Sequence, residues 1–161
     1  MLSTSDSKSK PDFQAMAELR YQIRRFLRFS ENAAHAGGIE PQQQQLLLAI
    51  KGLPARLKPT IGVLAERMQL QHHSAVGLID RLVDRGLLVR LRATDDKRQV
   101  LIKLTHDGEA CLSALALHHL NELQSVGPRF VNALQGLLDR TVSPSEPRTK
   151  ARKSIRSKNQ E

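Results

Sequence analysis

The residues best suited to chemistry in this chain are hydrogen-bond donors and cations in two short segments. His72, His73 and Ser74 stand at the start of one segment, and Lys97 and Arg98 stand at the centre of the other. Imidazole and hydroxyl groups can hydrogen-bond to base edges and phosphates, and a cation on a stiff ribbon can enter a narrow minor groove, where the negative potential of DNA is greatest. These residue types therefore predict contact with nucleic acid.

Other candidates lie near these residues: Gly77, Arg81, Arg90, Arg92 and Asp96. Each group has a structural alternative. The two histidines can be solvated, and a polar tip can pair its own Asp and Arg. A glycine inside a helix costs about 1 kcal/mol relative to alanine. Gly77 therefore reflects either close approach to DNA, close packing against a neighbouring helix, or no selection.

The charge of the chain also indicates an anionic partner. Its 161 residues contain 25 Lys and Arg against 16 Asp and Glu, a formal charge of +9. Residues 144–161 hold six basic and two acidic residues, so the excess is shared between this tail and the remainder of the chain. Nucleic acid and membrane surfaces are the simplest partners for such a charge.

Apolar and cysteine patterns exclude several classes. No apolar run approaches the roughly 18–20 residues that span a bilayer, and Met1–Pro11 has no apolar region typical of a secretory signal. The single cysteine, Cys111, excludes an internal disulfide framework and a multi-cysteine zinc site. We therefore expect a cytoplasmic protein without a membrane partner or a cofactor.

The position of the aromatic residues favours double-stranded DNA. None lies between residues 30 and 129; the five are Phe13, Tyr21, Phe26, Phe29 and Phe130. Proteins that bind single strands usually stack bases on aromatic side chains. The basic middle of this chain has no such side chain.

Periodicity and local signals predict the elements that would position these residues. The expected helices cover about 13–34, 41–51, 60–68, 71–85, 105–126 and 129–140, with a break at Gly127–Pro128, and the expected strands cover 88–92 and 98–104. Ala75, Leu78, Ile79 and Leu82 form one apolar stripe, which should be buried.

Short helices followed directly by a hairpin predict a mostly α fold of the winged helix-turn-helix type. In such a fold the helix 71–85 can enter a major groove, and its first residues usually reach the bases. We expect one domain over residues 13–142, with the winged part at 41–104. Residues 1–12 and 143–161 are rich in Ser, Lys, Arg or Pro and predict disorder.

Several motifs together resemble the MarR family of bacterial transcriptional regulators. The resemblance covers about residues 13–140 and rests on Leu64-Ala65-Glu66-Arg67, Leu78-Ile79-Asp80-Arg81-Leu82, Arg85-Gly86-Leu87-Leu88, Asp96-Lys97-Arg98 and Leu104-Thr105-x-x-Gly108. No single motif is specific, but their order and spacing are.

The resemblance implies a dimer that reads a pseudo-palindromic operator and responds to small phenolic or other anionic ligands, metals or oxidants. It implies that Arg98 is a minor-groove arginine, that Asp96 orients it, and that 71–85 is the recognition helix. Val76-Gly77 departs from the family, whose members often have Ser or Thr and Arg there. This departure affects the expected strength and sequence preference of the major-groove contact, and it does not affect the expected fold.

Leucine content supports a dimer independently of the resemblance. The segment 105–126 has more leucines than one buried stripe can hold: Leu112, Leu115, Leu117, Leu120 and Leu123. A two-fold partner would cover the surplus. We therefore interpret 13–37 and 105–140 as dimerisation helices.

Signals for an effector are weaker. Arg20 and Arg24 share a helix face and could bind a small anion or form ordinary ion pairs. Cys111 is either a redox sensor or a plain thiol. His118 and Glu122 have a spacing that can bind metal, but two ligands are poor support for a site, and we expect no metal.

The sequence therefore predicts a DNA-binding transcriptional regulator that acts as a homodimer, more often a repressor than an activator in the family it resembles. A winged-helix protein-interaction module is the alternative, favoured by the Val76-Gly77 departure and by Asp80 and Asp84 on the exposed face; nonspecific DNA binding, to which the basic tail could contribute, is another. We expect no enzyme, because the sequence has no glycine-rich phosphate loop, nucleophile elbow or zincin helix.

Overall fold

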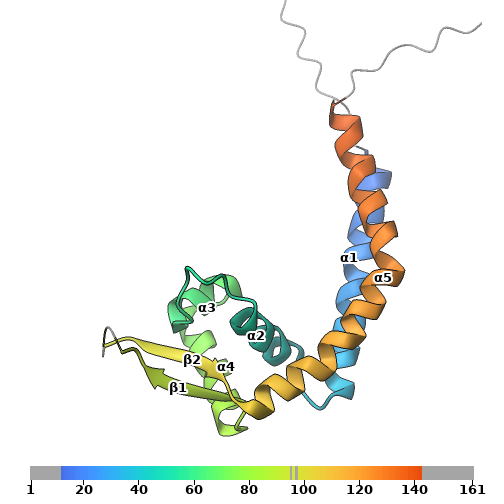
Figure 1. The fold of residues 1–161 in the computed structure, drawn as a ribbon. Helices are drawn as coiled ribbons and strands as arrows, with labels where there is room; N and C mark the ends of the chain where they lie inside the picture. Colours follow the sequence, from blue (N-terminus) through green and yellow to red (C-terminus); the bar gives the residue numbers. More distant parts are fainter. Residues whose placement is uncertain (1–11, 95, 97, 143–161) are drawn as a thin grey trace, which may run out of the picture.

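Two long helices pack side by side and carry a smaller lobe at one end (Figure 1). The computed structural model describes residues 12–94, 96 and 98–142. The segments predicted to be disordered, 1–12 and 143–161, lie outside the described residues except for Asp12. Among the described helices, none is long and apolar enough to cross a membrane.

The first long helix, α1 (Phe13–Ala36), begins and ends at local signals. The Asp12 carboxylate accepts a hydrogen bond from the Ala15 backbone N–H at 3.0 Å and so caps its first turn. Gly37 ends the helix, and Gly38 follows with φ of 72°, a conformation that glycine adopts without strain. The helix thus runs two residues beyond the expected end.

Three shorter helices build most of the lobe: α2 (Pro41–Lys51), α3 (Ile61–Arg67) and α4 (His72–Asp84). Proline occupies the first position of α2, where its missing N–H is not needed. The Thr60 hydroxyl accepts from the Val63 N–H and caps α3. The predicted apolar stripe of α4 is buried, as expected.

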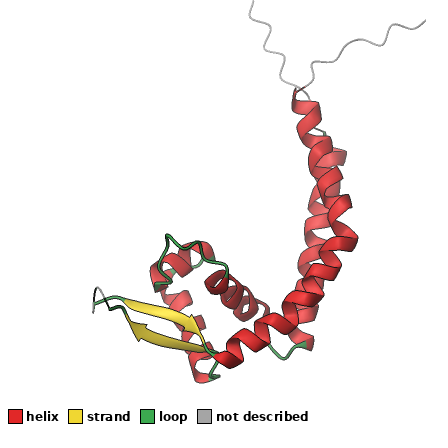
Figure 2. Ribbon diagram, viewed as in Figure 1, coloured by secondary structure: helices red, strands yellow, loops and turns green. Residues whose placement is uncertain are grey.

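The strands β1 (Leu88–Arg92) and β2 (Val100–Leu104) pair antiparallel, with Leu88 opposite Leu104. In the described part of the chain they form the only sheet (Figure 2). The prediction that β2 begins at Arg98 was wrong by two residues. The N–H groups of Arg98 and Gln99 hydrogen-bond to Asp96 in the turn, so they do not continue the ladder.

The second long helix, α5 (His106–Val142), is continuous, so the prediction of a break at Gly127–Pro128 was wrong. Proline inside a helix costs about 3 kcal/mol because it removes one hydrogen bond and crowds the preceding turn. Packing continues across it nevertheless: Val126 is buried and Phe130 is half-buried. Pro128 and Gln124, whose carbonyl loses its helical donor, are both exposed, so water can reach that carbonyl.

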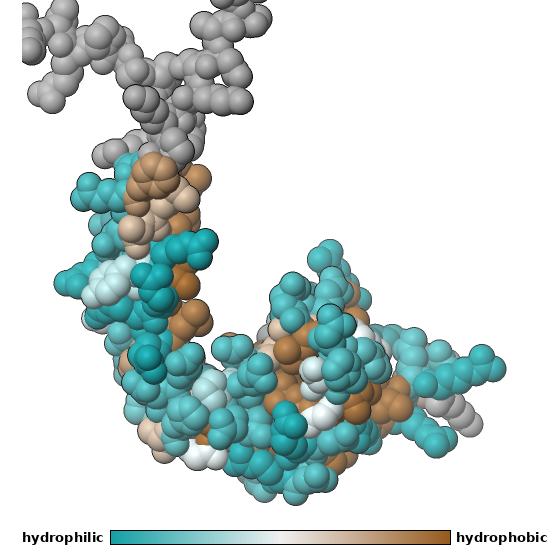
Figure 3. Space-filling model, turned by 180° about the vertical axis from the view of Figure 1, so that it is seen from behind, coloured by the Kyte–Doolittle hydropathy of each residue, from teal (hydrophilic) through white to brown (hydrophobic). Residues whose placement is uncertain are grey.

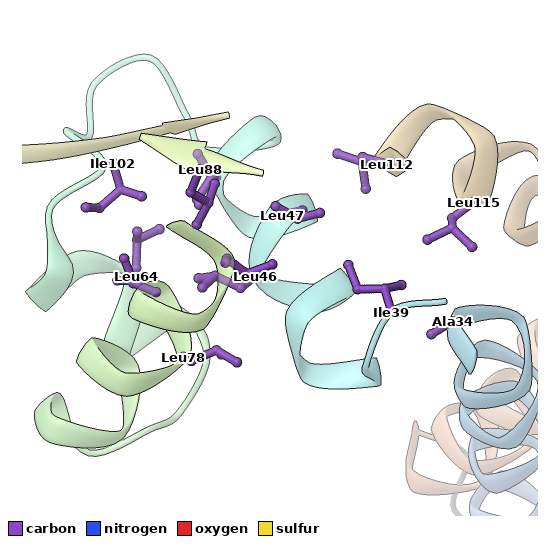
Figure 4. Packing of buried hydrophobic residues seen from close by; sticks show 13 residues of the cluster. Ala34, Ile39, Leu46, Leu47, Leu64, Leu78, Leu88, Ile102, Leu112 and Leu115 are labelled. Atoms are coloured by element: carbon purple, nitrogen blue, oxygen red, sulfur yellow. The ribbon is translucent and has the colours of Figure 1, made fainter. Parts of the chain in front are cut away.

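One apolar core joins the lobe to the long helices (Figure 4). Leu46 and Leu47 of α2 are completely buried. Ile39, just before α2, lies between these residues and Ala34, Leu112 and Leu115 of the long helices (Figure 4). Because α2 packs both within the lobe and against the long helices, it is one of the elements that attach the lobe to them.

Candidate nucleic-acid interface

A tight turn holds α4 directly after α3. The Gln69 backbone has φ of 52°, in the left-handed region that non-glycine residues rarely adopt. Its N–H donates to the Glu66 carbonyl at 3.0 Å, and the N–H of Leu70 donates to the Ala65 carbonyl at 2.9 Å. These bonds fix the direction in which α4 leaves the turn.

The first residues of α4 are free to meet a ligand. His72, His73 and Ser74 are exposed, on the side away from the buried stripe, and no described residue hydrogen-bonds to their side chains. Arg81 is exposed farther along the helix. The structure thus leaves accessible all four of these residues that the sequence singled out.

Gly77 lies in the same helix without a packing role. A Cβ added there would have one neighbour within 4 Å, the Nη1 atom of Arg81 at 3.7 Å. Close packing against another helix therefore does not explain this glycine. Close approach to a ligand and the absence of selection are the interpretations that stand.

An ion pair connects α4 to the hairpin. Arg90 of β1 donates to the Asp80 carboxylate of α4, with 2.5 Å between Nη2 and Oδ1. Both side chains stay more than one-third exposed, so the pair contributes little stability by itself. Sequence reasoning selected Arg90 as a free cation and missed this partner, because spacing along the chain gives no distance across the Gly86 turn. The pair bridges two surfaces that would have to act together.

The hairpin presents the remaining cations at its outer end. Arg92 and Arg98 are exposed and have no ion pair within the described residues. The Asp96 carboxylate accepts from the Arg98 backbone N–H at 3.0 Å. Asp96 thus holds the Arg98 backbone rather than its guanidinium. Lys97 lies outside the described residues.

The residues that the sequence suggested for binding an effector do not line one common cavity. Arg20 and Arg24 are exposed on α1, with no described ion pair, and line none of the described cavities. A cavity of about 380 Å³ lies instead between α1 and α5, close to the lobe; its lining is mostly apolar and includes Phe29, Cys111, Leu115 and His118. His118 and Glu122 do not belong to any group of three metal-binding side chains among the described residues.

Known proteins resemble both the sequence and the fold. Residues 37–99, which include α2, α3, α4 and β1, match the model of the MarR family. Over 81 residues the chain is 33% identical to the HTH-type transcriptional repressor YetL of Bacillus subtilis (strain 168). That match covers 50% of this chain and 47% of YetL, so it spans about half the length of this relative.

Solved structures extend the likeness to most of the chain. A probable transcriptional regulator from Pseudomonas aeruginosa has a TM-score of 0.59 and 25% identity, covering 81% of this chain and 98% of its own. A mutant MarR from E. coli, solved in complex with operator DNA, has a TM-score of 0.60 and 21% identity, covering 81% and 95%. The fold class predicted from the sequence, helical with a two-stranded wing, is confirmed. The family model over residues 37–99, the partial identity to a curated repressor and the shared fold agree with the motifs of the sequence, so the chain is similar to the MarR family in its winged part and shares the fold of solved MarR structures.

Proposed function

We propose that this chain is a transcriptional regulator that binds double-stranded DNA as a homodimer. The observation that carries the proposal is that two exposed polar surfaces, the start of α4 and the hairpin, lie next to each other and are bridged by the Asp80–Arg90 ion pair. A helix fits the major groove and a ribbon beside it can reach the minor groove.

Roles for individual residues follow from their accessibility. His72, His73 and Ser74 would contact base edges or phosphates, and Gly77 would allow the helix to approach. Arg81, Arg92 and Lys97 would contact phosphates, while Arg98 would enter the minor groove. Arg90 is already paired with Asp80, so we assign it mainly to positioning. Asp96 supports Arg98 through the backbone of the turn.

The long helices offer the surface for a second copy. Figure 3 shows apolar side chains along one side of these helices, next to a surface that is largely polar. Leu117, Leu120 and Leu138 are each more than half exposed, and Phe13 is 76% exposed. Apolar surface in such amounts is usually covered by a partner. We assign 13–37 and 105–140 to dimerisation and 41–104 to DNA binding, as the sequence indicated.

Repression and control by a ligand belong to the same proposal. YetL is named a repressor, and the E. coli MarR structure was solved with operator DNA. From the sequence we expect a small anionic effector. The cavity beside Cys111 could hold a small molecule, but its lining includes no arginine. This lining is more favourable to an apolar or weakly polar molecule than to the anion that Arg20 and Arg24 suggested.

The direct test measures affinity for the DNA immediately upstream of the coding region and for an unrelated duplex of equal length. The salt concentration should be about 150 mM, because nonspecific binding through phosphates falls steeply with salt. A preference of about a thousandfold or more is expected for a specific regulator. If the upstream DNA and the unrelated duplex bind equally weakly, the measurement is repeated with fragments from the whole genome. Equally weak binding to all of these fragments would contradict specific regulation and favour nonspecific binding or a protein partner.

A further inference from the structure

At the C-terminal end of α4, remote from the proposed base contacts, one side chain bonds to both α2 and the turn between α1 and α2. Arg85 follows α4 and donates two hydrogen bonds of 2.8 Å each. Its Nη1 donates to the side-chain oxygen of Gln43, and its Nη2 donates to the backbone carbonyl of Gly38. A single guanidinium therefore contacts both α2 and the turn between α1 and α2.

Both acceptors are fixed. Gly38 lies in the short turn where α1 leads into the lobe, and its φ of 72° makes that turn dependent on glycine. Gln43 is 4% exposed, and its side-chain oxygen also accepts from the Glu40 backbone N–H at 3.3 Å. Arg85 thus bonds to the joint between the long helices and the lobe, which consists of the turn between α1 and α2 and the start of α2.

Other polar contacts hold α2 to the long helices but do not reach α4. Gln44 lies 3.3 Å from the Nε2 atom of His119, which is also 2.8 Å from the Ser30 hydroxyl. Lys51 pairs with Glu109 of α5 at 2.6 Å. With α2 held in this way, the Arg85 bonds link the end of α4 to the joint between α1 and α2, while the Thr105 hydroxyl, which donates to the Gly86 carbonyl at 2.7 Å, links the next residue to the start of α5.

Arg85 is well separated from the proposed base contacts at the start of α4, although the proposed phosphate contact Arg81 lies one turn before it. Arg85 follows His72 by thirteen residues, which corresponds to about 20 Å along a helix. Two hydrogen bonds in fixed directions from one planar group are what arginine provides and what lysine cannot reproduce. The apolar face of α4, with Ile79 and Leu82 completely buried, keeps the lobe folded without them.

We infer that Arg85 is a positioning residue that sets the angle of α4 to the long helices and so the separation of the two recognition helices in the dimer. The inference rests on the proposed function. Recognition helices must stand about 34–36 Å apart to enter successive major grooves. A lobe free to tilt at its joint would lose selectivity for half-site spacing while keeping each individual contact.

The test uses the full chain and operators whose half-sites are separated by the natural spacing, by one base pair fewer and by one base pair more. For Arg85→Gln we expect about tenfold weaker binding at the natural spacing, comparable to the loss of one hydrogen bond to a charged group, and little change at the other two spacings. The slope of affinity against salt should not change, because no phosphate contact is removed. Arg85→Lys should behave like Arg85→Gln, whereas Ile61→Val, a mild change in the lobe core, should keep the wild-type spacing preference.

A second measurement examines the joint without DNA. Spin labels at Asp84→Cys, in a Cys111→Ser background, report the distance between the two copies of α4. We expect Arg85→Gln to broaden this distance distribution and Ile61→Val to leave it unchanged.

An unchanged distribution together with an unchanged spacing preference would overturn the inference and leave the proposed function intact. Equal weakening at all spacings with a reduced salt slope would also overturn it, because Arg85 would then contact DNA. Wild-type protein that selects no operator would overturn the proposed function.

Discussion

Gly108 lies directly against the backbone carbonyl of Leu87, so closely that a Cβ at position 108 would overlap the carbonyl oxygen. Thr105 holds the two segments at this distance: its hydroxyl donates to the Gly86 carbonyl at 2.7 Å and accepts from the Gly108 N–H at 3.1 Å. The spacing Thr105-x-x-Gly108 thus joins the start of α5 to the turn after α4.

Gly108→Ala should destabilise the protein by about 1–3 kcal/mol, the usual cost of forcing an extra carbon into a closely packed place. The neighbouring atom is backbone, so it cannot rotate away. Urea unfolding followed by circular dichroism measures the change in the free energy of unfolding.

Gly62→Ala is the matched control, because Gly62 lies in α3 and a Cβ there would meet no atom within 4 Å. This variant should be as stable as the wild type or more stable by up to about 1 kcal/mol, since alanine favours the helix. Wild-type stability for Gly108→Ala would mean that α5 can shift away from Leu87 at no cost.

Local signals predicted most of the fold because they act within a few residues. Thr60 as a cap, Pro41 at a first position and Gly86 after a helix determine backbone geometry on their own, and these helix boundaries were correct to within one or two residues. The break at Gly127–Pro128 was wrong because packing between the long helices, which local signals do not encode, continues across the proline.

The candidate interface divides in the same way. Exposure of His73 and Ser74 followed from the helical period, which places them away from the buried stripe. The partners of Asp80 and Arg85 were not predicted, since each bond joins residues of different elements. Opposite charges near a turn were the one available signal for Asp80 and Arg90. Nothing in the sequence indicated the bond from Arg85 to Gln43.

Arg98→Ala should weaken operator binding by about 1–3 kcal/mol and leave the dimer intact, because the side chain is exposed and bonds to no described residue. Titration by fluorescence anisotropy measures the affinity. Arg129→Ala removes the same charge from an exposed position of α5 and should have little effect. Wild-type affinity for Arg98→Ala would exclude the wing from the interface.

Asp80→Asn should release Arg90 from its ion pair and increase the dependence of DNA affinity on salt by about one phosphate contact. The cost in folding stability should stay below about 1 kcal/mol, because both partners are exposed. Asp84→Asn changes the net charge of the same helix equally but frees no described arginine. If both variants show the same salt slope, Arg90 is not released to the DNA.

The wild-type chain should sediment as a dimer of about 36 kDa, twice its mass of 18.0 kDa. Leu120→Glu should weaken the dimer at least about tenfold, because it places a charge in the surface that we assign to the partner. Leu48→Glu is a matched control in α2: Leu48 is 54% exposed and Leu120 is 55% exposed. A wild-type monomer at micromolar concentration, or equal effects of the two variants, would contradict the assignment of the interface to the long helices.

Lys51 lowers the pKa of Glu109 below its ordinary value of 4.5, first through their hydrogen bond and then through its charge. The folded state therefore favours the ionised carboxylate. The stability that the pair contributes is complete above the ordinary pKa of Glu109 and is lost as the pH falls through the lowered pKa.

In Lys51→Ala the pKa of Glu109 should rise toward its ordinary value, and the difference in stability between this variant and the wild type should vanish in acid. Carboxyl NMR titration follows Glu109 directly, with Lys103→Ala as a control that removes an exposed lysine elsewhere. A Glu109 titration curve that is identical in Lys51→Ala and the wild type would show that the contact between α2 and α5 does not persist in solution.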